Sequence, residues 1–97
     1  MRERVIERYL FEQIKQLGGM CIKMEPRYAA GIPDRLILFN SDAIFVEVKA
    51  PGKKPTQKQI LFHKRLDEQG IPVYIIDSKQ GVDDLVEILD SDTEWLC

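Results

Sequence analysis

Apolar residues recur with helical spacing in three parts of the chain. Along Glu3–Leu17 they return every three or four positions, which predicts one buried helix face. A second helix is expected from residue 57 to about residue 69, because Thr56 can cap its start and Gly70 stops it. A closing amphipathic helix is marked by four apolar residues, Val82, Leu85, Val86 and Leu89.

Four short apolar runs predict strands. They are Met20–Met24, Arg35–Phe39, Ala43–Val48 and Val73–Asp77. A loop, Glu25–Pro33, follows the first run, and a turn at Asn40-Ser41-Asp42 joins the next two into a hairpin. The first three strands should form an antiparallel meander, and the fourth, which follows a helix, is expected to pair in parallel. The order therefore predicts an α/β domain with a mixed sheet flanked by helices and a further helix at the C-terminus.

Size and composition are those of one globular domain. The 97 residues suit a single unit over 1–97, and 44% of them are hydrophobic. No apolar run approaches the roughly 20 residues of a membrane span, and the N-terminus lacks the apolar segment of a secretory signal. We therefore expect a cytoplasmic protein with no membrane partner. Cys21 and Cys97 belong to no Cys-x-x-Cys pair and there is only one histidine, which argues against a zinc site. In the cytoplasm, free thiols are favoured over a disulfide between them.

Charge is distributed unevenly along the chain. The net charge is −2, yet residues 83–97 contain six acids and no base, so residues 1–82 carry a net charge of +4. The last part, from about 91 to 97, is expected to form an acidic tail. Residues 49–65 contain six Lys or Arg and no acid, and such a stretch can contact phosphates. Taken alone, a run of this kind is more often a solvated helix face.

Three charged residues mark a candidate metal site. Glu47 and Lys49 alternate with valines, so both side chains lie on one face of a strand that is otherwise apolar. Burying them there is costly without a partner. Asp34 opens the preceding strand, and antiparallel pairing places it across from Glu47. Two carboxylates beside a lysine suit Mg²⁺, which prefers oxygen ligands and promotes attack on phosphodiesters. A bare Glu-x-Lys is commonly a surface ion pair, and Asp34 upstream favours the metal site.

Other polar residues near this pattern leave alternatives open. Gln59 lies on the apolar face of the second helix, where it either serves the site or bonds to backbone at the edge of the core. His63, one turn later, is either structural or a phosphate contact. Glu3 and Glu7 in the first helix either reach the site or only interact with the helix dipole.

The motifs, taken in order, resemble the virus-type replication-repair nuclease (VRR-NUC) domain of the restriction-endonuclease-like, PD-(D/E)xK superfamily. The resemblance runs from about Glu3 to Asp77. It rests on Gly31-Ile32-Pro33-Asp34-Arg35, on Glu47-Val48-Lys49-Ala50-Pro51-Gly52, and on Gln59 with Leu66 and Gly70. It implies an αβββαβ core and hydrolysis of DNA phosphodiester bonds.

The resemblance also assigns roles to residues. It makes Asp34 and Glu47 metal ligands with the Val48 carbonyl, Lys49 the catalytic lysine, and Gln59 the glutamine of the family's helix. It implies Mg²⁺, with Mn²⁺ as a substitute, and no nucleotide cofactor. The family's first-helix glutamate corresponds to Glu3 or Glu7. We expect DNA contacts from five further side chains, Arg27, Lys53, Lys54, Lys58 and His63.

Small members of this family resemble junction-resolving enzymes that act as homodimers. We therefore expect a structure-selective endonuclease for branched DNA, such as four-way junctions, in a bacterial or phage-infected cytoplasm. The alternatives are a flap- or end-processing nuclease, a restriction-like nuclease, and a catalytically silent DNA-binding module.

Overall fold

A computed structural model describes residues 1–24 and 30–94. Its elements are α1 (Glu3–Leu17), β1 (Met20–Lys23), β2 (Arg35–Phe39), β3 (Asp42–Val48), α2 (Gln57–Glu68), β4 (Val73–Ile76) and α3 (Lys79–Glu94). The strands form one mixed sheet in the order β1-β2-β3-β4, in which β4 alone runs parallel to its neighbour. The predicted α/β fold, with its meander and parallel fourth strand, is confirmed.

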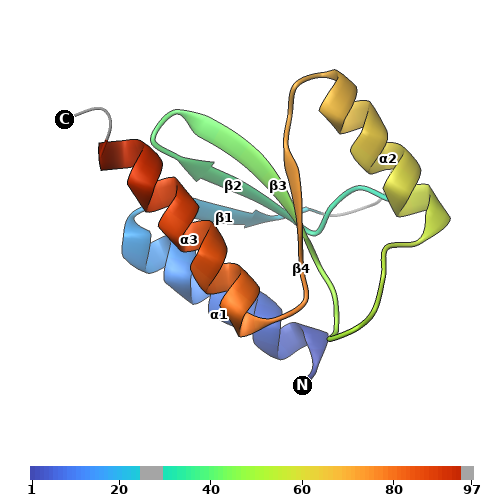
Figure 1. The fold of residues 1–97 in the computed structure, drawn as a ribbon, viewed down its shortest axis with the longest axis horizontal. Coiled ribbons are helices and arrows are strands. Elements are labelled where there is room, and N and C mark those ends of the chain that lie inside the picture. Colours follow the sequence, from blue (N-terminus) through green and yellow to red (C-terminus); the bar gives the residue numbers. More distant parts are fainter. Residues whose placement is uncertain (25–29, 95–97) are drawn as a thin grey trace.

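The helices α1 and α3 lie side by side under one face of the sheet (Figure 1). Their apolar stripes meet alternate residues of β3, and together with Ile37 and Ile76 these side chains make up the core. The α1 contribution is Ile6, Leu10 and Ile14, as its spacing predicted. On β3, Ile44, Val46 and Val48 point into this core, so Phe45 and Glu47 point to the opposite face.

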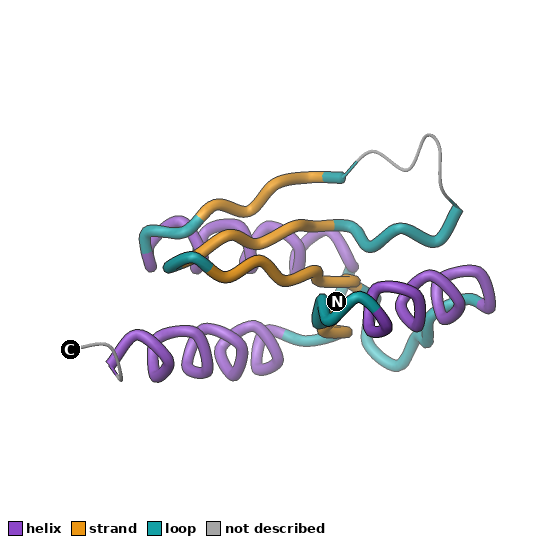
Figure 2. The backbone as a smooth tube through the Cα atoms, turned by 90° about the horizontal axis from the view of Figure 1, so that it is seen from above, coloured by secondary structure: helices purple, strands orange, loops and turns teal. Residues whose placement is uncertain are grey.

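On the other side of the sheet, α2 lies beside one end of the strands, where its Gln59 and His63 approach Glu47 (Figure 2). No residue of α2 is fully buried, which distinguishes it from α1. None of the helices in the described part of the chain has the length and apolar character needed to cross a membrane. Cys21 is a free thiol packed against the core, and burial raises its pKa to about 11; Cys97 lies outside the described residues.

The strands β1 and β4 each end one residue earlier than expected, at Lys23 and Ile76. Two other boundaries differ from the sequence-based expectation for clear reasons. Asp42 belongs to β3 rather than to the turn, because Asn40 and Ser41, both with positive φ, complete a two-residue hairpin turn by themselves. The closing helix continues to Glu94, so the acidic tail expected from residue 91 is helical over 91–94. This stretch contains neither glycine nor proline to stop a helix. Residues 95–97 lie outside the described part.

Candidate active site

The hairpin brings Asp34 and Glu47 together. Arg35 pairs with Val46 in the antiparallel register, so Asp34, one residue earlier, faces the next position on β3. The Val48 N–H donates a hydrogen bond of 2.7 Å to Asp34 Oδ2. This bond fixes the carboxylate at the end of β3, beside the residue whose carbonyl the resemblance assigns to the metal.

Glu47 is the centre of the site, and its side chain is only 1% exposed. Gln59 Nε2 donates to Glu47 Oε2 over 3.1 Å, and Lys49 Nζ lies 3.8 Å from the same oxygen. His63 Nε2 lies 3.5 Å from the other oxygen, Oε1. Neither Glu47 Oε1 nor His63 Nε2 has a hydrogen-bond partner among the described residues. The site therefore contains a buried carboxylate oxygen with unused capacity to accept a ligand.

Burial and the neighbouring Asp34 raise the pKa of Glu47 to about 8. The Lys49 ammonium opposes this effect, and the Glu3 carboxylate adds to it. Burial, followed by the Lys49 charge, lowers the pKa of His63, so its imidazole is neutral at pH 7. Both pKa shifts favour the neutral form of the side chain, because burial excludes water from it and a like charge lies nearby.

The start of α2 determines how Gln59 is presented. Thr56 and Gln59 form a capping box, in which the Thr56 side chain accepts from the Gln59 N–H and Gln59 Oε1 accepts from the Thr56 N–H over 2.8 Å. Because the amide oxygen is used there, Nε2 is left to donate to Glu47. Gly31 lies against this first turn with φ +90, and a Cβ on it would lie 2.3 Å from the Lys58 carbonyl oxygen. Gly31 therefore permits the close approach that positions α2.

The two acids of α1 have different surroundings. Glu7 accepts a hydrogen bond of 2.8 Å from Arg35 Nε, in an ion pair that is largely buried. The pKa of Glu3 is raised by burial and then by the Asp34 charge, and Lys49 lowers it, so Glu3 interacts electrostatically with the site. Both acids line a depression that also contains Asp34. Glu3 is thus electrically coupled to the candidate site, whereas Glu7 is committed to Arg35.

The predicted DNA contacts fall into three groups. Lys53, Lys54 and Lys58 are exposed on the loop before α2 and on its first turn. His63 faces the Glu47 carboxyl rather than solvent. Arg27 lies outside the described residues. Arg35 had no predicted role. It lies two residues before Ile37 on β2, so its side chain is on the same face of the sheet, towards α1.

A divalent cation fits the donor set. Among the described residues, no three His, Cys, Asp or Glu side chains converge as a cage for a metal. Two carboxylates and a peptide carbonyl form a smaller set of oxygen donors, and this suits Mg²⁺, which usually keeps several waters. Glu47 Oε1, which has no hydrogen-bond partner among the described residues, is available to join this set of donors.

Comparison with known proteins identifies the family. No family model matches the chain. The chain is 42% identical over 80 residues to "Putative nuclease p44" of Acyrthosiphon pisum secondary endosymbiont phage 1, across 81% of this chain and 86% of that protein. A solved structure described as a VRR-NUC domain matches with a TM-score of 0.81 and 31% identity, over 90% of this chain and 97% of that one. The chain belongs to the VRR-NUC family of nucleases, which confirms the resemblance found in the sequence.

Proposed function

We propose that this nuclease is a Mg²⁺-dependent DNA endonuclease that hydrolyses phosphodiester bonds. The observation that carries the proposal is the buried Glu47 carboxyl next to Asp34, with one oxygen that has no hydrogen-bond partner in the described part of the chain. A second buried acid is destabilising unless protonated or matched by positive charge. Asp34, Glu47 and the Val48 carbonyl would hold the cation, and Mn²⁺ would substitute for it.

The residues around the cation have separable tasks. When bound, Mg²⁺ makes attack by water easier and offsets negative charge on the phosphate. Gln59 orients the Glu47 carboxylate through its hydrogen bond to Oε2. The Lys49 ammonium lies beside the same carboxylate, where it can orient a water or stabilise the charge that develops on the phosphate. Glu3 adds negative charge at the border of the site and favours cation binding.

Branched DNA is the proposed substrate, with a homodimer as the acting form. The exposed lysines beside α2 supply phosphate contacts, and the phage relative carries a nuclease name. The second sheet face supports self-association. By strand register it presents a row of apolar side chains, of which Met20 is 58% and Ile75 is 52% exposed. An exposed apolar face of this kind typically marks an interface. A dimer would present two active sites to the two strands of a four-way junction.

Cleavage assays test the catalytic part. The purified protein is incubated with Mg²⁺ and a four-way junction, a flap or a plain duplex. We expect cutting of the junction that is lost on chelation and lost in Asp34→Asn. The matched control Asp42→Asn, at the exposed first residue of β3, should stay active. Equal cutting of plain duplex would contradict selectivity for branches. No cutting of any substrate with Mg²⁺ or Mn²⁺ would contradict the whole proposal.

Solution mass tests the assembly. We expect a dimer by light scattering, and Ile75→Asp should convert it to a monomer because a charge cannot be buried in an apolar interface. Ile60→Asp is the control, since Ile60 is 50% exposed on α2, an element separate from the sheet face. A monomeric wild-type protein would favour the flap- or end-processing alternative over junction resolution.

A further inference from the structure

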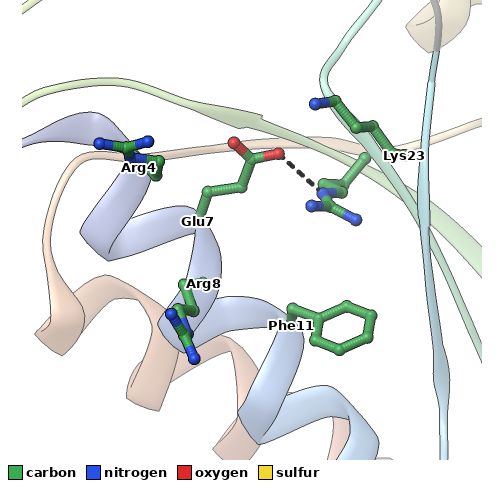
Figure 3. A pocket seen from close by; sticks show the side chains of 6 residues that line it. Arg4, Glu7, Arg8, Phe11 and Lys23 are labelled. Carbon is green, nitrogen blue, oxygen red and sulfur yellow. Dashed lines mark hydrogen bonds and ion pairs between the residues drawn. The ribbon is translucent and has the colours of Figure 1, made fainter.

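A groove between α1 and β1 adjoins the active site and has no role in the proposal above. Figure 3 shows the side chains that line it, which are Arg4, Glu7, Arg8, Phe11, Lys23 and Arg35. Three of them, Arg4, Glu7 and Lys23, also line the depression that contains Asp34. The two hollows are therefore neighbours that share a wall, and a polymer bound at Asp34 can continue into the groove.

The groove is strongly positive. Four of its lining side chains are cationic and one is anionic. The one acid, Glu7, is neutralised by Arg35 at 2.8 Å, so it does not oppose an incoming anion. Among the described residues, neither Arg4 nor Lys23 forms an ion pair. Arg8 pairs with Glu12 over 3.3 Å, but both side chains are largely exposed, and such a pair is weak and easily exchanged for a phosphate.

Arg35 and Phe11 form a fixed inner wall. Arg35 donates to Glu7 and, over 3.3 Å, to the Cys21 carbonyl, and its guanidinium lies 5.7 Å from the centre of the Phe11 ring. The Phe11 ring is held on one side by this contact and remains 40% exposed. Proteins bind single-stranded nucleic acid with an exposed aromatic ring beside cationic side chains, because bases stack on the ring while phosphates contact the cations.

We propose that this groove binds the substrate strand on one side of the cleavage point. Arg4 and Lys23 hold a backbone phosphate next to the scissile one, and Phe11 provides a stacking face for an unpaired base. Arg4 and Phe11 are seven residues apart on α1, about 10 Å along the helix at 1.5 Å per residue. This length accommodates one phosphate and an adjoining nucleotide. The inference rests on the proposed nuclease function, since it extends the path of the same substrate.

The groove also distinguishes branched from plain DNA. A base can stack on Phe11 only where it is unpaired or easily unstacked, which is the case at the branch point of a junction or flap. The lysines near α2 contact phosphates in any DNA form and supply no such selection.

Binding measurements test the groove separately from cleavage. In an Asp34→Asn background with Mg²⁺, fluorescence anisotropy gives the affinity for a labelled four-way junction and a duplex over a range of salt concentrations. Arg4→Ala combined with Lys23→Ala should weaken junction binding about tenfold and reduce the salt slope by about one for each cation removed. Lys15→Ala removes a cation from the last turn of the same helix, outside the groove, and should change neither quantity.

The aromatic part has its own test. Phe11→Leu should weaken binding of the junction about tenfold and leave duplex binding unchanged, and Phe11→Tyr should restore the junction affinity. An unchanged salt slope in the Arg4 and Lys23 double variant, or an equal change of slope in Lys15→Ala, would overturn the proposal that the groove binds a backbone phosphate. Equal losses for junction and duplex in Phe11→Leu overturn the stacking role. If the wild-type protein cuts no substrate, the proposed nuclease function fails. The binding comparisons then still show whether the groove binds DNA.

Discussion

Replacing Glu47 with Gln should stabilise the metal-free protein while abolishing cleavage. The folded protein keeps a proton on Glu47 up to about pH 8, whereas the unfolded chain releases it near 4.5. Between these values the folded state binds more protons, so the free energy of unfolding falls as the pH rises. At pH 7 the cost is roughly 3 kcal/mol, at about 1.36 kcal/mol for each pH unit above 4.5. The side chain is 1% exposed, so solvent screening does not reduce this cost.

The amide of Glu47→Gln has no such cost. The amide has nearly the same shape as the carboxyl group, and its oxygen can still accept a hydrogen bond from Gln59. Its NH₂ group can donate to Asp34 and to His63 Nε2, which both lie next to the Glu47 side chain. Since about 1 kcal/mol shifts the melting temperature of a domain this small by about 4–8 °C, the gain at pH 7 should exceed about 10 °C.

Thermal unfolding followed by circular dichroism, in a chelating buffer from pH 5 to pH 8, measures this gain. The difference between Glu47→Gln and wild type should be small at pH 5 and grow towards pH 8. Added Mg²⁺ should then stabilise the wild type and leave the variant unchanged. Glu68→Gln, at an exposed position on α2, is the matched control and should show no pH-dependent gain. A gain that is the same at every pH, or a loss, would refute the burial argument.

Two further predictions concern how α2 is positioned. Gly31→Ala should lower the free energy of unfolding in urea by roughly 2 kcal/mol or more and impair cleavage, because its Cβ would meet backbone 2.3 Å away. Gly52→Ala is the control, because Gly52 has a similar φ of +79 but open space around it, so the substitution introduces backbone strain without a clash. Equal losses of unfolding free energy in the two variants would contradict the role of close packing at Gly31. Gln59→Ala and Thr56→Ala both break the capping box and should each cost about 1 kcal/mol. Only Gln59→Ala also loses the hydrogen bond to Glu47, so kcat should fall in that variant alone; an equal fall in Thr56→Ala would show that Gln59 acts only through the helix start.

The sequence by itself determined the order of elements and the pairing of the central hairpin. These features follow from local periodicity, since a helix repeats every 3.6 residues and a strand every two. The same strand alternation placed Glu47 and Lys49 on one face, and the hairpin register then brought Asp34 opposite Glu47. The order of the motifs was specific enough to identify the VRR-NUC family, which the comparisons confirm.

Tertiary structure decided the contacts between elements that no local pattern encodes. The sequence left both Glu3 and Glu7 as candidates for the first-helix glutamate of the site. The tertiary structure distinguishes them, because Glu7 forms an ion pair with Arg35 whereas Glu3 interacts with the charge of Asp34. The orientation of His63 towards Glu47 likewise depends on how α2 lies across the end of the sheet.

The extent to which the Glu47 side chain is buried is the property that was hardest to predict from the sequence. A Glu-x-Lys pair has the same sequence on an exposed strand as on a covered one. The pKa of Glu47 reaches about 8 because α2 and the hairpin exclude water from it and because Asp34 lies beside it. The basic groove beside α1 has the same origin. Its side chains come from an N-terminal helix and from two strands that follow it, and they form one surface only once the sheet has packed on that helix.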